Sequence, residues 1–487
     1  LVWLQEIART KRVILDVFAS PYSLLDIKSF TNIESVLVSY QNSTIAQDAS
    51  AQLIFGAFKA KGKLPVSIND SFTAGDGLTS TNLSRLTYGM PENVGMSSAK
   101  LGKLDSVANV IIKQKMAPGL QLLVAKKGQV VYHKSFGYHS AEKSHPVKNT
   151  DLYDLASVTK ILGGLPAIMK AYEDKKFTLD TPIGDLMPVL KGSDKDSITV
   201  KEALAHYGGF QAWIPYYLFT FDSITKKPSK EFYHVRKSRD YNIQVARNLY
   251  LKTSYMDTIY KMIADSPLRE KPGYKYSGLI FYLFKDYIEK TYKMPLNVFD
   301  DVNFYNPLGA TSLTYKPLEK FSNNRIVPTE VDANFRRQLL HGYVHDQGAA
   351  MLGGVSGNAG LFSNANDVAK MMQMYLQKGY YGGKRFLRSE TVETFNKRYY
   401  EDKDVRRGLG FDKPQLDEEV KATCGCVSPE SFGHSGYTGT YAWADPKTEL
   451  VYVFLSNRVY PNSDNTKLVE KNIRTLVQRL VQEAIID

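Results

Sequence analysis

The first apolar runs of this chain are short and alternate with a helical pattern. Residues 12–18 and 35–40 read as buried strands, and residues 47–58 carry apolar side chains at helical spacing. Short apolar strands separated by helices are typical of a parallel α/β layer. Because two strands alone do not make a stable sheet, residues 1–70 are predicted to be the end of a larger α/β domain.

The pattern changes twice over the next 60 or so residues. Residues 71–95 are rich in Ser, Thr, Gly, Asp and Asn, which indicates a linker. Residues 97–115 then place apolar side chains on one helical face. Two apolar strands at 119–125 and 130–133 flank a polar turn, and this arrangement predicts an antiparallel hairpin.

The remaining sequence, from residue 160 onward, predicts a helical region followed by strands and a final helix. Residues 160–330 are mostly helical in pattern and include a long polar and aromatic insertion at 216–265. Strand patterns return at 433–444 and 450–455, and a helix at 466–485 ends the chain. The simplest arrangement is an α/β half made from both chain ends with a helical half inserted between them. Residues 96–487 are therefore expected to form one domain.

A serine stands three positions before a lysine where the apolar run 161–169 begins: Ser157 and Lys160. Residues i and i+3 share one face of an α-helix, so the amine could accept the proton that a serine must lose to become a nucleophile. The same spacing recurs at Ser97/Lys100, Ser140/Lys143 and Ser223/Lys226. Those three lie in polar contexts, where Ser97 reads as a helix cap. Only Ser157 enters an apolar helix, whose first amides could also stabilise an oxyanion.

Composition narrows the function classes. The 487 residues carry 62 basic and 50 acidic side chains, a net charge of +12 that no basic run concentrates, so we expect a solvated surface and no nucleic-acid partner. No stretch reaches the ~18 apolar residues of a membrane span. Cys424 and Cys426 are one residue apart, a spacing that strains a disulfide and supplies too few ligands for a zinc site, so we interpret them as incidental. We expect no metal and no cofactor.

Two later stretches could complete a serine site. Residues 272–279, beginning with Pro272, break a helix and present Tyr276, whose phenol could approach the nucleophile. Residues 433–440 space glycines along a strand edge around His434, Ser435 and Gly436, which lets a substrate backbone approach closely.

The order of three short motifs, Ser157-Val158-Thr159-Lys160, Tyr276-Ser277-Gly278 and His434-Ser435-Gly436, resembles the serine β-lactamase and penicillin-binding superfamily on its class C and esterase side. The resemblance extends over residues 95–487 and includes stretches at 203–209, 344–346 and 353–362. It implies a β-lactamase-like/transpeptidase fold, α/β plus all-α, in which an antiparallel sheet is flanked by helices and an inserted helical subdomain.

The same resemblance implies roles. Ser157 would be the acylated nucleophile, Lys160 and Tyr276 the proton-transfer pair, and the amides of Ser157 and Tyr437 the oxyanion hole. His434, Ser435 and Gly436 would bind substrate. His206 and His345, which stands beside Asp346, are interpreted as structural.

Two positions depart from the family pattern. His434 stands where a lysine is usual, so the local positive charge is expected to depend on pH near neutrality. Gly278 stands where the family has Asn or Asp, so an amide that would hold the lysine and the substrate is expected to be missing. Both departures predict poor turnover of β-lactams.

Residues 1–70 resemble the carboxyl-terminal part of the α/β sandwich of family 3 glycoside hydrolases, a family that includes β-N-acetylglucosaminidases. Together the two resemblances imply a periplasmic or exported bacterial amidase that cuts between N-acetylmuramic acid and the peptide of peptidoglycan fragments. The chain begins with Leu1, so we expect a longer parent protein whose signal sequence lies outside it. The alternatives are an esterase, a D,D-peptidase or a weak β-lactamase, and, from another class, an inactive cell-wall-binding module.

Overall fold

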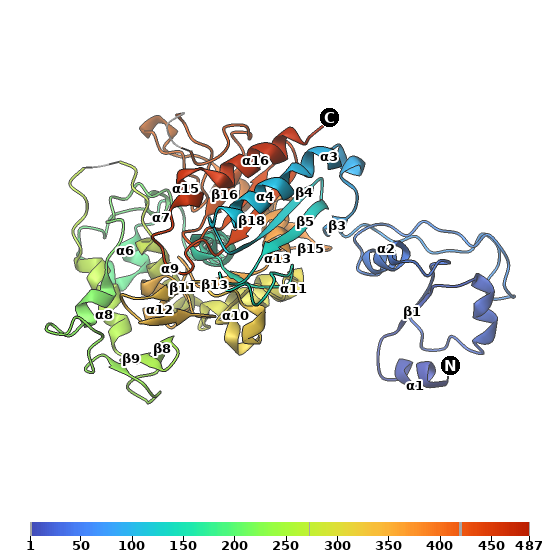
Figure 1. Ribbon diagram of the computed structural model, residues 1–487, viewed down its shortest axis with the longest axis horizontal. Coiled ribbons are helices and arrows are strands. Elements are labelled where there is room, and N and C mark those ends of the chain that lie inside the picture. Colours follow the sequence, from blue (N-terminus) through green and yellow to red (C-terminus); the bar gives the residue numbers. More distant parts are fainter. Residues whose placement is uncertain (1, 272, 418–420, 487) are drawn as a thin grey trace. The chain divides into compact units, whose positions relative to one another are not determined.

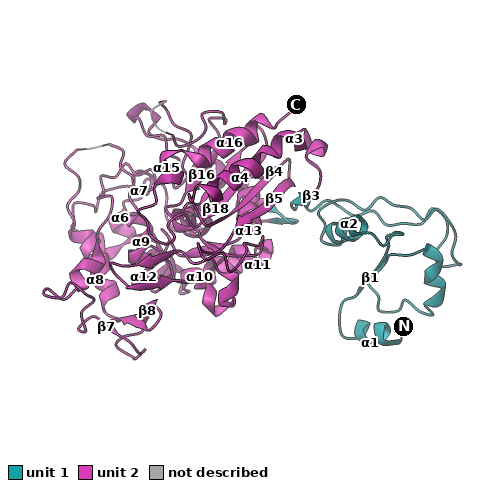
Figure 2. Cartoon of the chain, in the orientation of Figure 1, with its two compact units in different colours: residues 1–88, 381–384 teal, residues 89–380, 385–487 magenta. Residues whose placement is uncertain are grey.

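The computed structural model describes residues 2–271, 273–417 and 421–486, so Pro272 of the predicted helix break lies outside the described residues. The chain divides into two compact units (Figure 2). Unit 1 contains residues 1–88 and 381–384, and unit 2 contains residues 89–380 and 385–487. Each unit is described by itself below.

Unit 1 contains the parallel strand pair that the sequence predicts. Its elements are α1 (Val2–Ala8), β1 (Ile14–Val17), β2 (Ser35–Val38), α2 (Thr44–Ile54) and β3 (Thr87–Tyr88). Strands β1 and β2 run parallel, with Ile14 opposite Ser35. Helix α2 starts earlier than its apolar pattern suggests because the Ser43 hydroxyl accepts the Ala46 amide and caps the helix. The likeness of this segment to family 3 glycoside hydrolases stays a prediction.

The main sheet of unit 2 is antiparallel (Figure 1). Its consecutive neighbours are β16 (Phe432–Ser435), β17 (Tyr441–Asp445), β18 (Leu450–Ser456), β4 (Gly119–Lys126) and β5 (Gln129–Gly137). The predicted hairpin is confirmed, because β4 and β5 pair across the turn at residues 127–128. Every residue of β18 and β4 is buried, as expected for central strands covered on both faces.

Helices cover both faces of this sheet. On one face, α3 (Ser98–Leu101), α4 (Lys103–Lys113), α15 (Lys467–Glu470) and α16 (Ile473–Glu483) pack on alternate side chains of β4 and β18, including Leu120, Leu122, Val124, Tyr452 and Phe454. Helix α13 (Ala365–Leu376) packs on the opposite face. Ser97 caps α3, as predicted, by accepting the Lys100 amide. The sheet thus joins both ends of unit 2's chain.

The chain between β5 and β16 supplies the helical half and several small sheets. The helices are α5 (Leu165–Glu173), α6 (Ile183–Leu186), α7 (Val200–Leu204), α8 (Tyr255–Asp265), α9 (Leu279–Tyr292), α10 (Leu296–Asp300), α11 (Asn306–Leu308), α12 (Gln347–Met351) and α14 (Ser389–Asn396). The strands are β6 (Tyr153–Asp154), β7 (Tyr233–His234), β8 (Ile243–Ala246), β9 (Leu249–Leu251), β10 (Thr314–Tyr315), β11 (Glu330–Asp332), β12 (Gln338–Leu340), β13 (Leu361–Ser363), β14 (Tyr380–Tyr381) and β15 (Lys384–Arg385). The insertion at 216–265 folds as the sheet β7-β9-β8 followed by α8.

One expectation about the cysteines is wrong. Cys424 and Cys426 form a disulfide, with their Cα atoms 5.2 Å apart, a separation within the usual range for such bonds. The spacing in sequence did not reveal this, because a bent loop brings the two backbones to a distance that an extended strand would not.

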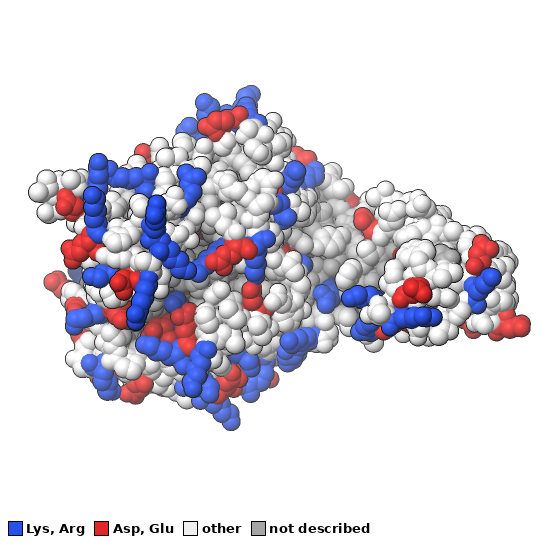
Figure 3. Space-filling model, turned by 90° about the horizontal axis from the view of Figure 1, so that it is seen from below, with Lys and Arg blue, Asp and Glu red and all other residues white. Residues whose placement is uncertain are grey.

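The surface carries both signs of charge. On the face that Figure 3 shows, lysine and arginine side chains are spread out with aspartate and glutamate among them. Among the described residues, no helix is both long and apolar enough to cross a membrane.

Candidate active site

Ser157 lies on a short 3-10 turn, η3 (Ala156–Val158), directly after β6, and its side chain is partly exposed. The preceding residue, Ala156, has φ 46°, a left-handed conformation that costs a non-glycine residue about 1 kcal/mol. The Asp154 carboxylate holds this turn, because its two oxygens accept the amides of Ala156 at 2.8 Å and of His345 at 2.7 Å. Burial raises the pKa of Asp154, and the two amides oppose that rise.

A second set of contacts comes from the turn between β16 and β17. The hydroxyls of Thr438 and Thr440 donate to the carbonyls of Asp154 and Leu155 at 2.7 and 2.8 Å. Only glycine fits at position 436, because a Cβ there would lie 2.5 Å from the Leu155 carbonyl oxygen. The backbone before Ser157 is therefore fixed against the sheet edge.

The helix after Ser157 is not the continuous α-helix that the sequence predicts. Residues Lys160–Gly164 form a π-helical turn, η4, before α5 begins. Pro166 has no amide to donate to the Leu162 carbonyl, and the Tyr305 hydroxyl takes that place at 3.0 Å. The Tyr375 hydroxyl likewise donates to the Ile161 carbonyl at 2.8 Å. Wide turns of this kind are frequent at functional sites.

The structure brings Lys160 to Ser157. Lys160 Nζ lies 3.0 Å from Ser157 Oγ and 3.0 Å from the carbonyl oxygen of Asn358. The lysine is only 2% exposed, and its Nζ lies 5.2 Å from the centre of the Tyr276 ring. A buried amine with few partners is well placed to exchange a proton with the serine.

Tyr276 is the second group at the serine, because its hydroxyl donates to Ser157 Oγ at 3.0 Å. His206 fixes the backbone on both sides of this tyrosine. Its carbonyl accepts the Lys275 amide at 3.0 Å, and its Nδ1 accepts the Ser277 amide at 3.2 Å. Burial and the nearby cations lower the pKa of His206 well below its usual value, so the ring is neutral and can accept this hydrogen bond. This agrees with the structural role expected for His206.

His345 and Asp346 also have structural partners. The His345 amide binds Asp154, and Asp346 accepts the Tyr282 hydroxyl and the Ala349 amide that begins α12. The glycine-rich segment that follows α12 therefore starts from a fixed point.

The structure revises the expected role of His434. This side chain is 2% exposed, and Arg407 Nη1 donates to its Nε2 at 3.0 Å while Nδ1 lies 2.7 Å from the Ser435 carbonyl oxygen. Nε2 must therefore be the acceptor, which places the ring proton on Nδ1. Burial, then Arg407 and Lys160, lower the pKa of His434 well below its usual value. The expectation of a charge that titrates near neutrality is wrong, since His434 is neutral there.

The permanent positive charge next to His434 is Arg407, which sequence reasoning missed. The guanidinium lies 5.0 Å from the Tyr276 ring centre, and its Nε lies 3.2 Å from both the Tyr274 hydroxyl and Asp412 Oδ1. Arg406 contacts the same aspartate at 3.0 Å. Burial opposes the charge on Arg407, but Asp412 and the tyrosines outweigh burial and raise its pKa. No local pattern around residue 407 indicates this role, because His434 and Tyr274 lie 27 and 133 positions away in the sequence.

A side-chain amide also lies beside Gly278. A Cβ at position 278 would be 3.8 Å from Asn358 Cβ and 3.9 Å from Asn358 Nδ2. Asn358 therefore brings a side-chain amide close to this position from another part of the chain. That amide is engaged, because Nδ2 donates to the Tyr282 hydroxyl and Oδ1 accepts from Ser356. The Asn358 backbone, rather than its side chain, holds Lys160.

The two amides expected to form an oxyanion hole are free to bind a ligand. Among the described residues, neither the Ser157 amide nor the Tyr437 amide donates a hydrogen bond to another group of the protein. Tyr437 is 55% exposed, and its ring lies 4.7 Å from the Arg458 guanidinium and 5.5 Å from the His345 ring. Ser435 is partly exposed at the end of β16.

The part of the chain that the structure describes contains no group of three or more His, Cys, Asp or Glu side chains that could hold a metal ion. The chemistry available at this site is that of a hydroxyl, an amine, a phenol and two free amides.

Comparison with known proteins agrees with this geometry. Residues 108–474 match the family described as Beta-lactamase. A Salmonella typhi protein described as "Putative D-alanyl-D-alanine carboxypeptidase" is 32% identical over 412 residues, which cover 79% of this chain and 88% of that protein.

Solved structures are more distant in sequence. EstCE1, "a hydrolase with promiscuous acyltransferase activity", has a TM-score of 0.55 at 16% identity, over 80% of this chain and 99% of that one. A penicillin-binding protein homologue from Caulobacter crescentus has a TM-score of 0.52 at 18% identity, over 74% and 93% of the two chains. An octameric homologue from Pyrococcus abyssi has a TM-score of 0.54 at 20% identity, over 79% of each chain. At these identities the likeness concerns the fold alone, and the predicted fold class is confirmed.

Proposed function

The chain belongs to the Beta-lactamase family of serine hydrolases, and from this premise we propose that it cleaves an amide bond in a peptidoglycan-derived peptide through an acyl-enzyme on Ser157. The observation that carries the proposal is the position of Ser157 Oγ, 3.0 Å from both Lys160 Nζ and the Tyr276 hydroxyl. Both distances lie within the range needed for proton transfer.

In the proposed reaction, Tyr276 first loses its phenol proton beside the charged Lys160, and its oxygen then takes the proton of Ser157 Oγ as the serine attacks the carbonyl carbon. The same pair then delivers a proton to the leaving amine, and the acyl group stays on the serine. The cations Lys160 and Arg407, 5.2 and 5.0 Å from the Tyr276 ring centre, would stabilise negative charge on the phenol oxygen. In the second half, a water beside the same pair attacks the ester and releases the acid.

The amides of Ser157 and Tyr437 are proposed to bind the carbonyl oxygen as it becomes negative. Preorganised donors of this kind contribute about 3 kcal/mol each to the transition state. The contacts of Thr438 and Thr440 with residues 154 and 155 would keep the two amides in register.

The charge around the site favours an anionic substrate. Among the described residues, Arg406 and Arg407 share Asp412 as their ion-pair partner and Lys160 has no acidic partner, so positive charge exceeds negative charge among these groups. An excess of one sign in a partly enclosed site attracts a ligand of the opposite sign. A peptide that ends in a carboxylate next to its scissile bond meets this requirement, and the Salmonella relative carries the name of a carboxypeptidase acting on such an end. We therefore place D-alanyl-D-alanine carboxypeptidase activity first.

The amidase between N-acetylmuramic acid and peptide, the first choice from the sequence, is the second candidate. It depends on the resemblance of residues 1–70 to a glycoside hydrolase, which the parallel pair β1 and β2 is compatible with. An esterase would use the same groups. Any of these cell-wall substrates would place the enzyme outside the cytoplasm of a bacterium.

Mass spectrometry of the full chain incubated with defined substrates tests the proposal. The panel contains a pentapeptide ending in D-Ala-D-Ala, an N-acetylmuramyl-peptide, a cephalosporin and a short-chain ester. The expected result is loss of the terminal D-Ala from the pentapeptide by the wild type and none by Ser157→Ala. Cleavage of the muramyl bond alone would favour the second candidate, and no product from any substrate would favour an inactive binding module.

A further inference from the structure

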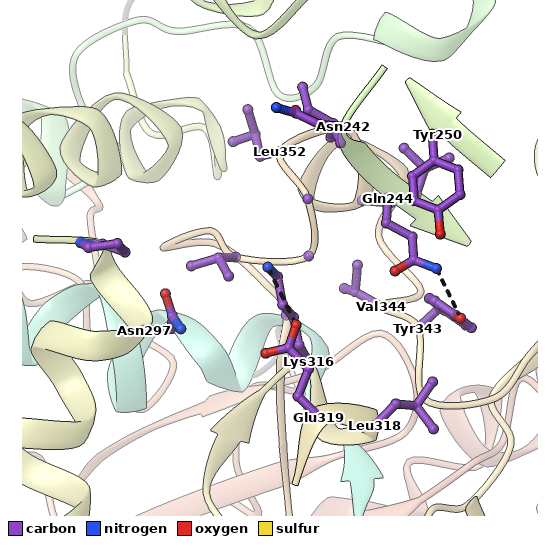
Figure 4. Close-up of a pocket in the computed structure, with 18 of the residues that line it drawn as sticks. Asn242, Gln244, Tyr250, Asn297, Lys316, Leu318, Glu319, Tyr343, Val344 and Leu352 are labelled. Atoms are coloured by element: carbon purple, nitrogen blue, oxygen red, sulfur yellow. Dashed lines mark hydrogen bonds and ion pairs between the residues drawn. The ribbon is translucent and has the colours of Figure 1, made fainter. Parts of the chain in front are cut away.

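Unit 2 contains a cavity of about 390 Å³ that Ser157, Lys160 and Tyr276 do not line (Figure 4). Its volume is within the range that small ligands occupy in proteins. The walls come from β8 and β9 of the insertion, from α9 and the start of α10, from the segment 316–319 and from the glycine-rich loop 353–360.

Polar side chains reach the cavity from several of these elements. Three carboxamides and two phenols line it: Asn242, Gln244, Asn297, Tyr250 and Tyr343. Figure 4 shows Gln244 and Tyr343 side by side, and Gln244 Nε2 donates to the Tyr343 hydroxyl at 3.3 Å. Carboxamides offer both donors and acceptors, so they suit a ligand that contains peptide groups.

Two pairs of opposite charge also line the cavity, and they differ in tightness. Lys285, only 5% exposed, binds Glu289 at 2.7 Å. Lys316 Nζ, in contrast, lies 3.9 Å from Glu319 Oε1, well beyond the 2.7–2.9 Å typical of a charge-assisted hydrogen bond. The Lys316 backbone has φ 44°, a left-handed conformation that is rare outside glycine and that tends to occur at binding sites.

The weakly associated pair Lys316 and Glu319 is available to a ligand, because the two side chains are 43% and 70% exposed. An ammonium and a carboxylate a few ångströms apart match a ligand that carries one charge of each sign. A purely anionic ligand would be repelled by the Glu319 carboxylate. An uncharged sugar would form no ion pair with either Lys316 or Glu319.

We propose that this cavity is a second binding site, for an amino acid or short peptide with a free ammonium and a free carboxylate. The ligand carboxylate binds Lys316, its ammonium binds Glu319, and the carboxamides of Asn242, Gln244 and Asn297 contact its peptide group. This site is separate from the one assigned to the reaction, and it does not depend on the proposed activity.

The cavity shares one loop with the catalytic lysine. Gly353, Gly354 and Gly360 line the cavity, whereas the carbonyl of Asn358, between them, accepts from Lys160. A ligand in the cavity would therefore contact the loop that positions Lys160.

Isothermal titration calorimetry of the 487-residue Ser157→Ala protein, a variant that removes turnover, tests the proposal. The probes are alanyl-alanine dipeptides of both chiralities, the same dipeptides with acetylated amine and amidated carboxyl groups, and N,N′-diacetylchitobiose. The free dipeptide is expected to bind, and the blocked dipeptide and the disaccharide are not.

Variants in the same background locate the binding. Lys316→Met and Glu319→Gln, both at exposed side chains, should each weaken dipeptide binding at least tenfold. Lys320→Met is the matched control, because Lys320 pairs with Asp301 and does not line the cavity. The proposal is overturned if no free dipeptide binds, if both cavity variants bind it like the control, or if the blocked dipeptide binds equally well.

Discussion

At the scale of single residues, the candidate site combines residues that sequence motifs predict with residues that only the structure reveals. Ser157, Lys160 and Tyr276 stand in short motifs. The structure places the Lys160 amine and the Tyr276 hydroxyl each 3.0 Å from the Ser157 hydroxyl oxygen. Arg407 stands in no motif, and Asn358 lies in the glycine-rich stretch 353–362, whose pattern assigns it no role. Their positions follow from contacts with His434 and Lys160 that span 27 and 198 positions of the chain, which local patterns do not encode.

Replacement of Arg407 tests whether this buried cation supports the reaction. Arg407→Met removes the donor to His434 and one of the two cations at the Tyr276 ring. We expect kcat/KM to fall about 100-fold, equivalent to ~2.7 kcal/mol of lost transition-state stabilisation. The pKa of His434 should also rise from its depressed value. His434 would then become protonated at acidic pH, and kcat/KM should fall there in the variant but not in the wild type.

Arg406→Met is the matched control, because Arg406 binds the same Asp412 but does not contact His434. It should move the pH profile less than Arg407→Met does, because Arg406 contributes less than Arg407 to lowering the pKa of His434. An equal loss in both variants with unaltered pH profiles would mean that Arg407 has only a structural role.

At the scale of elements, the sequence predicts most of unit 2 and fails where tertiary contacts override local pattern. The terminal helices follow from periodicity because each buries one regular face, and the central strands β4 and β18 follow from continuous apolar runs. The helix at Ser157 does not, because Pro166 removes a backbone donor and Tyr305, a residue 143 positions away from Leu162, replaces it. The Cys424–Cys426 disulfide was missed for a similar reason, since the shape of its loop is set by surrounding contacts.

The loop 353–360 is the element that connects Lys160 with the helical half, and Asn358 tests its importance. Asn358→Ala keeps the backbone carbonyl that Lys160 binds but leaves the Ser356 hydroxyl without its acceptor, while the Tyr282 hydroxyl keeps its hydrogen bond to Asp346. A buried polar group left unpaired costs about 1–3 kcal/mol, so the loop should loosen. We expect kcat to fall roughly tenfold with little change in KM, measured by steady-state kinetics.

Gly278→Asn is the companion variant. Its new side chain would start at an ordinary contact distance from Asn358, 3.8 Å between Cβ atoms, so the fold should tolerate it.

If Asn358→Ala turns over substrate at the wild-type rate, the loop does not position the lysine.

At the scale of the whole molecule, buried ionisable groups make stability depend on pH. Lys413 is 3% exposed, and burial, then Arg398, lower its pKa from 10.5 to about 7. In the unfolded chain this lysine keeps its proton up to its ordinary pKa. Between pH 7 and about 9 the unfolded state therefore binds more protons, and the free energy of unfolding should rise with pH.

Chemical denaturation at pH 7, 8 and 9 measures this effect. We expect the wild type to gain on the order of 1–3 kcal/mol over this range. Lys413→Met should lose most of this rise, because it removes the group that titrates. Lys403→Met, at a side chain that is 58% exposed, is the control and should keep it. A rise of the same size in Lys413→Met would show that other groups cause it.

The assignment of Ser157 as the acylated residue is the central claim, and direct detection of the acyl-enzyme tests it most closely. The 487-residue protein is incubated with a penicillin, quenched in acid, and examined by intact mass and peptide mapping. The account predicts one covalent adduct, located on the peptide that contains Ser157 and absent from Ser157→Ala. An adduct on another residue, or turnover of any substrate by Ser157→Ala at the wild-type rate, would contradict it.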